Sequence, residues 1–185
     1  LDGLDSDDAV YVAGKLAPDK REKLLDRLQQ TTRTLIEQGL AYDEDSAGRL
    51  MQRELVAVPN YWTVGETIDY LRSTTNVPDK FYAVFVVDPR HCPQGMVELH
   101  RVLTSKRSVR MKYIAGKALE IISTDMDKEE VAFLFRQHDL TAAPVVDKSG
   151  RLIGQITIDD VVDVIDEEAG EDFLKLAGVR ATEDS

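Results

Sequence analysis

The sequence contains an internal repeat, and this repeat restricts the possible folds more than any other feature. The stretch Phe85–Asp88 (FVVD) matches Pro144–Asp147 (PVVD) at an offset of 59 residues, and Gly95 and Gly154 follow at the same offset. A pattern that recurs at a fixed offset indicates two copies of one supersecondary unit. Each copy reads as an extended lead-in, a helix, two strands and a second helix.

The upstream half of the repeat matches less closely. Residues 66–68 (ETI) match 129–131 (EEV) at an offset of 63, so the first copy should hold about four extra residues, within 73–79. The extended lead-ins are expected at 55–58 and 119–122. Because each unit has one apolar sheet face that needs cover, we expect the two copies to pack sheet to sheet as a pseudo-twofold pair.

The second copy leads into a strongly acidic part of the chain. A strand at 142–146, a turn at 147–150 and a strand at 152–158 precede a helix, in which residues 159–172 carry eight carboxylates and no basic residue. The apolar stripe that the helical spacing predicts consists of Val161, Val162, Ile165 and Ala169. The carboxylates admit two interpretations, a solvated face that keeps the chain soluble or a set of oxygen ligands for Mg²⁺ or Ca²⁺.

Charge and composition argue against several classes of function. A net charge of −11 argues against nucleic acid and anionic membrane surfaces as partners and favours cations or a basic protein surface. The single cysteine, Cys92, cannot form an internal disulfide and fits a reducing compartment. No apolar run approaches 18 residues, and no Ser-His-Asp order, phosphate-binding glycine loop or HExxH motif occurs, so we expect neither a membrane span nor an enzyme. The chain starts at Leu1 without a methionine, so we expect it to be part of a longer protein.

Residues 1–44 have the pattern of a helical segment. The acids within 5–8 (DSDD) are interpreted as helix caps, and Pro18 is expected in the first turn of another helix. Gly39 is a candidate helix stop. The polar stretch 42–48 (YDEDSAG) then marks a domain boundary.

The tandem of units, each with VVD, then a glycine, a hydrophobic strand and a helix, resembles a CBS domain pair. The second copy fits the (S/T)xxD signature of that family well at 154–160 (GQITIDD). The resemblance implies that Thr157 and Asp160 hold the ribose and phosphate of an adenine nucleotide such as ATP. Read from the residues alone, they are an ordinary strand residue and a helix-start acid. The first copy departs from the signature, with Glu98 in place of the hydroxyl residue and Arg101 in place of the aspartate.

Three further motifs narrow the resemblance. They lie at 42–51 (YDEDSAGRLM), 124–132 (TDMDKEEVA) and 167–179 (EEAGEDFLKLAGV). Together with the repeat they resemble the cytosolic part of the MgtE family of bacterial Mg²⁺ transporters and channels, strongly over 40–179 and weakly over 1–39. The implied fold class is α+β, a helical segment followed by a tandem CBS pair. Its expected divisions are a helical segment at 1–44, CBS domains at 45–108 and 109–172, and at 173–185 the start of a connector to a transmembrane domain.

In that family the cytosolic region is a homodimer that senses Mg²⁺. Ions that bridge its carboxylates favour a compact assembly, and this assembly shuts the pore. The resemblance therefore implies a regulatory module at the cytoplasmic face of a bacterial inner or plasma membrane. Its implied ligand is Mg²⁺, and its implied partners are a second copy bound through the CBS pair and the transmembrane domain of the same polypeptide. The alternative is an adenine-nucleotide-sensing CBS module of another protein. A third interpretation is a plain dimerisation module that responds to neither ligand.

The resemblance also implies metal-binding positions, residue by residue. They are Asp7 in the helical segment, Asp127, Glu129 and Asp139 between the domains, and Asp160, Asp163, Glu168, Glu171 and Asp172 around the connector. Tyr11 stands where the family has a second carboxylate, one turn after Asp7. Arg136 is expected near the acids between the domains, where its guanidinium could partly replace a cation. Because Mg²⁺ keeps several waters and binds through one or two carboxylates, such sites should be weak.

Overall fold

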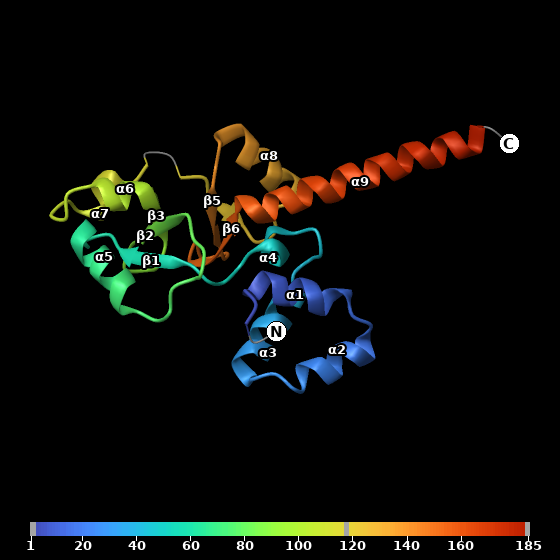
Figure 1. Cartoon of the computed structure of the whole chain (residues 1–185), viewed down its shortest axis with the longest axis horizontal. Coiled ribbons are helices and arrows are strands. Elements are labelled where there is room, and N and C mark those ends of the chain that lie inside the picture. The colour runs from blue at the N-terminus through green and yellow to red at the C-terminus, as the bar shows by residue number, and fades with distance from the viewer. Residues whose placement is uncertain (1–2, 117–118, 184–185) are drawn as a thin grey trace.

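The structure is a computed structural model that describes residues 3–116 and 119–183 (Figure 1). It begins with three helices, α1 (Ser6–Lys15), α2 (Pro18–Leu25) and α3 (Gln30–Leu40), followed by the short helix α4 (Ala47–Leu50). The first copy of the repeat contains β1 (Val56–Pro59), α5 (Val64–Ser73), β2 (Ala83–Val87), β3 (Pro93–Glu98) and α6 (Leu99–Thr104), and α7 (Met111–Ile114) follows it. The second copy contains β4 (Ile122–Ser123), α8 (Lys128–His138), β5 (Ala142–Val146), β6 (Leu152–Thr157) and α9 (Ile158–Glu183). The predicted α+β class and order of elements are confirmed.

The two copies form two sheets of identical topology. In each, the first strand runs parallel to the middle strand, and the middle strand pairs antiparallel with the last, in the orders β1-β2-β3 and β4-β5-β6. The offset of 59 holds for the last two strands, including an irregularity at Val86/Val87 that recurs at Val145/Val146. The offset of 59 is therefore confirmed in three dimensions.

The upstream offset of 63 is wrong by one residue. Val58 pairs with Val86 in the first sheet, and Ile122 pairs with Val145 in the second, which makes the upstream offset 64. The loop between α5 and β2 spans 74–82, whereas the loop between α8 and β5 spans 139–141, and α5 is one residue shorter than α8. The first copy therefore holds five extra residues rather than four, and they lie in the loop that follows α5.

The sheets pack against each other, as expected. All five residues of β2 and all five of β5 are buried. One buried cluster joins the two sheets and contains Phe85, Val87, Ala142 and Leu152. The other faces of the sheets are covered by the helices, so each middle strand is buried on both sides and reads as a continuous apolar run.

The segment between the helical part and β1 packs on the second copy rather than the first. Ala47 and Met51 belong to the same buried cluster as Phe135 on α8. Gln52 pairs with Gln155 on β6, and a Cβ at Gly154 would lie only 2.8 Å from the carbonyl oxygen of Gln52. Glycine at that position therefore permits this close approach, and residues 45–52, expected to begin the first CBS domain, contact the second.

The N-terminal helices form a small cluster of their own. Its buried residues are Ala9, Ala13, Leu25 and Ile36. Pro18 occupies the first turn of α2, as predicted. Gly39 does not end α3, which continues to Leu40; a Cβ there would collide with Val10, so the glycine lets α1 and α3 approach. Asp5 stands at the start of α1 but makes no side-chain capping hydrogen bond, so capping does not explain its presence.

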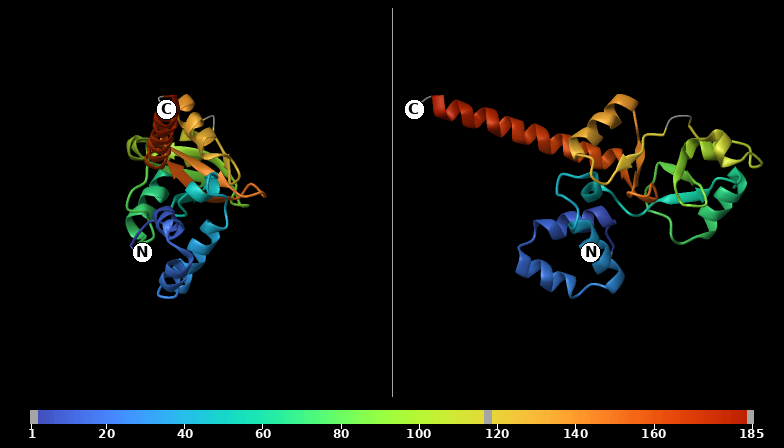
Figure 2. Two further views of the ribbon diagram at one scale, coloured as in Figure 1. Left: turned by 90° about the vertical axis from the view of Figure 1, so that its right-hand side faces the viewer. Right: turned by 180° about the vertical axis from the view of Figure 1, so that it is seen from behind.

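Helix α9 begins directly after β6 and leaves the body of the molecule (Figures 1 and 2). Val161 and Val164 are buried, whereas Val162 is 46% exposed and Ala169 is also exposed. The predicted stripe is therefore wrong at Val162 and Ala169, because α9 contacts α8 only along its first turns and every residue from 169 to 178 faces solvent. Within residues 3–116 and 119–183, no helix is long and apolar enough to cross a membrane. The expected connector boundary at 172 falls inside this continuous helix, and residues 184–185 of the connector lie outside the described part.

Candidate functional site

Two carboxyl groups, Asp7 of α1 and Asp160 of α9, meet where the N-terminal helices dock on the second copy; we call this contact the acid–acid junction. Each residue lies in the first turn of its helix, where the helix dipole favours negative charge. Burial, the charge of Asp160 and a hydrogen bond to Asp160 together raise the pKa of Asp7 to about 8. The docked contact therefore favours the protonated form of Asp7.

Asp160 is held in place by Thr157 at the end of β6. The Thr157 backbone N–H and its hydroxyl both donate to Asp160 Oδ2 at 3.0 Å. Burial raises the pKa of Asp160, while the hydrogen bonds from Thr157 and Asp7 oppose that shift. Two half-buried carboxylates in contact cannot both ionise at low cost without a positive charge nearby, so this junction favours either a proton or a cation.

The surroundings of the acid–acid junction are rich in oxygen atoms. The Ser6 hydroxyl donates to Glu54 Oε2 at 2.7 Å and accepts from the Arg53 backbone N–H at 2.7 Å, which fixes the start of α1 on residues 53–54. Gln155 Nε2 donates to the Glu54 carbonyl at 2.9 Å. Asp7 Oδ1 is buried and finds no hydrogen-bond partner among residues 3–116 and 119–183. This unpartnered oxygen is the kind of atom that a hard cation would satisfy.

A second contact, which we call the lysine junction, joins the linker after α3 to α9 through Lys128 at the start of α8. Lys128 Nζ lies 2.9 Å from Asp45 Oδ1 and 3.7 Å from Glu167 Oε2. Burial alone lowers the pKa of Lys128, but the hydrogen bond to Asp45 and the charges of Asp45, Glu167 and Glu171 outweigh it and raise the pKa. The ammonium group is therefore firmly charged and surrounded by carboxylates.

A third group of acids gathers around Glu168, where α8 packs on α9. Burial and the charges of Glu129 and Asp172 raise the pKa of Glu168, while the charges of Arg136 and Lys128 lower it. Glu168 Oε1 is buried and has no hydrogen-bond partner in the described ranges. Arg136, expected near the acids between the domains, thus lies close enough to Glu168 of the connector group to affect its pKa.

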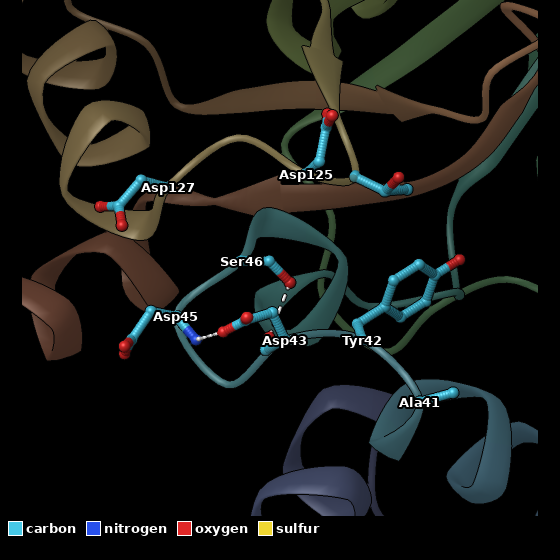
Figure 3. Close-up of a pocket in the computed structure, with 8 residues that line it drawn as sticks. Ala41, Tyr42, Asp43, Asp45, Ser46, Asp125 and Asp127 are labelled. Atoms are coloured by element: carbon cyan, nitrogen blue, oxygen red, sulfur yellow. Dashed lines mark hydrogen bonds between the residues drawn. The ribbon is translucent and has the colours of Figure 1, made fainter.

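Beside the lysine junction the structure has an acidic cavity of about 490 Å³ (Figure 3). Its lining includes four aspartates from two segments, Asp43, Asp45, Asp125 and Asp127. Asp127 also caps α8, because its side chain accepts a hydrogen bond from the Glu129 N–H at 2.8 Å. A hydrogen bond from Ser123 lowers the pKa of Asp125, so that carboxylate is ionised.

The predicted metal-binding residues are brought together only in part. Asp7 meets Asp160, and Glu129, Glu168 and Asp172 lie near one another. Asp139 ends α8 in a left-handed conformation, about 18 Å along the helix from Asp127 at a rise of 1.5 Å per residue, so these two acids cannot share one ion. Asp163 and Glu171 are exposed on α9, and Glu171 lies 3.8 Å from Lys175.

Among the residues that the structure describes, no three or more His, Cys, Asp or Glu side chains are grouped tightly enough to hold a metal ion. The structure instead places carboxylates in pairs at contacts between segments. Such pairs agree with the expectation that Mg²⁺ binds through one or two carboxylates and keeps several waters. Tyr11, which replaces a second acid, is 56% exposed with Lys15 Nζ 5.2 Å from its ring centre. Asp45, Asp125 and Lys128 are not among the predicted site residues, although Asp45 lies in the motif at 42–51 and the other two lie in the motif at 124–132.

The predicted nucleotide residues are engaged within the protein. Thr157 is 5% exposed and bonds to Asp160, which in turn faces Asp7 of the docked α1. In the first copy, Glu98 Oε2 lies 3.1 Å from His100 Nδ1, so a carboxylate occupies the position of the signature hydroxyl. Neither copy presents the open hydroxyl and aspartate pair that the signature implies.

Comparisons with known proteins match both parts of the chain. Residues 1–45 match the MgtE intracellular N domain, and residues 113–167 match the CBS domain. The chain is similar to the magnesium transporter MgtE of Thermus thermophilus, at 38% identity over 93% of this chain and 38% of that protein. It is also similar to the magnesium transporter MgtE of Enterococcus faecalis, at 31% identity over 80% of this chain and 33% of that protein. The chain thus spans about two fifths or less of the length of these relatives.

Solved structures agree with the sequence matches. The crystal structure of the cytosolic domain of the Mg²⁺ channel MgtE in complex with ATP superposes with a TM-score of 0.82 at 36% identity, covering 88% of this chain and 67% of that one. The soluble part of a magnesium transporter superposes with a TM-score of 0.83 at 28% identity, covering 90% of this chain and 65% of that one.

Proposed function

Because the chain belongs to the MgtE family and corresponds to the cytosolic region of its members, we propose that it senses intracellular Mg²⁺ and regulates a magnesium transporter or channel. Relatives are described as magnesium transporters and a Mg²⁺ channel, and the family is not one of enzymes. In the proposed mechanism, Mg²⁺ binds carboxylates that meet between segments and favours the compact arrangement. Without the ion, the docked contact must hold two like charges or take up a proton at Asp7, and either cost favours separation of the segments.

The observation that carries this proposal is the acid–acid junction. Asp7 and Asp160 come from segments that must stay together for the helical part to remain docked, and they face each other with raised pKa values. Asp7 Oδ1 has no partner among the described residues. Mg²⁺ would supply the positive charge that lets both groups ionise, with Asp7 and Asp160 as its protein ligands.

The remaining predicted positions would act as weaker sites of the same kind. The group of Glu129, Glu168 and Asp172 supports this idea, because its acids also meet between two helices and leave Glu168 Oε1 unpartnered within the described ranges. Asp127, Asp139, Asp163 and Glu171 are proposed as further, more exposed ligands. Several weak sites that favour the same arrangement would make its response to Mg²⁺ steep.

The partners of the chain are part of the same proposal. We expect a second copy to bind through the CBS pair, because Leu103 on α6 and Val162 on α9 occupy equivalent repeat positions and are 65% and 46% exposed. The direction of α9, away from the body (Figure 2), suits a connector to a transmembrane domain. The switch at the first turns of α9 would then be transmitted along a continuous helix.

The test is a Mg²⁺ titration of the isolated chain, followed by limited proteolysis and small-angle scattering. We expect Mg²⁺ at millimolar concentration to protect the chain from cleavage and to reduce its radius of gyration. Asp7→Asn should greatly reduce this response, whereas Asp8→Asn should leave it intact, because Asp8 is the exposed neighbour on the same helix turn. Equal responses of the two variants would contradict the role of the acid–acid junction.

Nucleotide sensing is the second candidate, supported by the related cytosolic domain that was crystallised with ATP. Thr157 and Asp160 are occupied by each other and by Asp7 while α1 is docked. We therefore expect AMP and ATP, added at constant free Mg²⁺, to leave the thermal stability of the chain unchanged. Stabilisation by nucleotide together with no effect of Mg²⁺ would favour the alternative function.

A further inference from the structure

Lys128 contacts the linker with both its backbone and its side chain. Its backbone N–H donates to the Asp45 carbonyl at 2.8 Å, and its Nζ lies 2.9 Å from Asp45 Oδ1. The side chain is 23% exposed, less than its carboxylate partners Asp45 and Glu167 at 64% and 48%. The ammonium group is thus the inner member of the cluster, and the acids lie around it.

The side chain of Lys128 also reaches α9. Nζ lies 3.7 Å from Glu167 Oε2, and Glu171 follows one turn further along α9. The amine therefore lies between carboxylates of two segments, the linker and α9. An ammonium with three donors suits several carboxylates that come from different directions.

We propose that Lys128 is a built-in cation that holds the linker against α9 and replaces a divalent ion at that contact. This inference rests on the proposed function, because it states which contact of the Mg²⁺ switch needs no Mg²⁺. In this chain the lysine junction stays closed when the ion is removed, and the Mg²⁺ response arises at the acid–acid junction and around Glu168. Lys128 thereby lowers the Mg²⁺ concentration at which the whole assembly closes.

The experiment compares three variants of the 185-residue chain: Lys128→Gln, Lys128→Arg and the matched control Lys175→Gln. Lys175 also pairs with acids of α9, at 3.8 Å from Glu171 and 3.9 Å from Asp172, but it is 72% exposed and both of these pairs lie within α9. Hydrogen exchange of the α9 amides at 165–171 is measured in chelator and across a Mg²⁺ titration. These variants separate a bridging charge from an ordinary surface charge on the same helix.

In chelator, we expect Lys128→Gln to speed α9 exchange by roughly two- to fivefold, the range for a partly exposed ion pair. The Mg²⁺ midpoint should rise by a similar factor, and the titration should become steeper because the freed carboxylates then bind an ion. Lys128→Arg, which keeps the charge, and Lys175→Gln should both match the unmodified chain. The conservative rescue and the steeper titration would not follow from a merely structural role.

Two results would overturn the inference. One is a Lys128→Gln variant that exchanges and titrates like the unmodified chain, and the other is a Lys128→Arg variant that behaves like Lys128→Gln. The proposed function fails by a different result, namely that Mg²⁺ has no effect on the unmodified chain. If α9 of Lys128→Gln still loosened in chelator in that case, the built-in cation would stand without the Mg²⁺ switch.

Discussion

At the acid–acid junction Asp7 and Asp160 face each other directly, whereas at the lysine junction Lys128 lies between Asp45 and Glu167. Both contacts connect N-terminal residues to the first turns of α9. They differ in the source of their positive charge. The first must take a proton or a cation from solution, and the second carries its own.

This difference indicates how one acidic surface can be partly responsive and partly fixed. A net charge of −11 makes every contact between segments a potential site of repulsion. On the proposed function, a lysine at one contact would remove the dependence on ions there, and a pair of carboxyl groups at the other would create it. Sensitivity to Mg²⁺ would then be a property of individual contacts that single substitutions can move.

The largest effect is expected from Asp7→Lys, which would convert the acid–acid junction into a second lysine junction. The new ammonium would lie beside Asp160, already hydrogen-bonded by Thr157, and its flexible stem can adjust at the edge of the contact. Without Mg²⁺, protection of the helical part from proteolysis should rise by roughly tenfold or more, because a buried charge gains its partner. The titration with Mg²⁺ should then be nearly flat.

Asp8→Lys is the matched control for that substitution. It makes the same charge change in the first turn of α1 and has the same cost against the helix dipole, but residue 8 is exposed. A similar loss of Mg²⁺ dependence in both variants would mean that total charge matters and the junction does not.

The second effect is a dependence on pH confined to the acid–acid junction. The pKa of Asp7 is raised from 3.8 to about 8 in the docked state, so the docked state binds the proton more tightly than the undocked state. In chelator, docking should therefore be favoured below pH 4 and weaken as the pH rises to about 8, by at most about tenfold per pH unit. Small-angle scattering between pH 5 and 9 measures this trend.

Two controls sharpen the pH experiment. Asp7→Asn should remove most of the pH dependence of docking in chelator, since only Asp160, whose pKa is also raised, then remains to titrate at this junction. Saturating Mg²⁺ should also remove the decline, because the ion replaces the proton and releases it to the buffer. Docking that strengthens with pH in chelator would show that the charge of Asp7 is stabilised by groups other than those described above.

The strands and their pairing could be predicted because their signals are local. Alternating and continuous apolar runs, together with Asp147 and Gly150 at the turn, define β5 and β6 without reference to the rest of the chain. The upstream offset was missed by one residue, because short acidic and apolar patterns on a helix can match in two registers. The apolar stripe predicted for α9 includes Val162, but Val164 is the buried residue. Helical spacing alone does not distinguish the two, because only a narrow strip of α9 is covered by the rest of the protein.

The candidate site was predictable only where the family resemblance supplied it. The residues themselves suggest helix caps at positions 5–8, yet Asp7 turns to meet a carboxyl group 153 positions later in the chain. The contact of Lys128 with Asp45 joins positions 83 residues apart. Neither separation corresponds to a helix or strand repeat. Both contacts depend on how the helical part docks on the second copy, and no local sequence pattern encodes that docking.

The smallest of the three effects is expected from Thr157→Val, which removes a neutral donor from the acid–acid junction. The Thr157 hydroxyl donates to Asp160 at 3.0 Å and lowers the pKa of that group, so it stabilises the ionised form that Mg²⁺ binds. Its loss should weaken Mg²⁺ binding by about fivefold, as expected for one hydrogen bond of about 1 kcal/mol. Thr157→Ser keeps the hydroxyl and should restore the affinity. The Thr157 hydroxyl stabilises the charge of Asp160 as the Lys128 ammonium stabilises the charge of Glu167, but more weakly because the hydroxyl is neutral. An unchanged Mg²⁺ affinity in Thr157→Val would therefore show that the ion does not bind at Asp160.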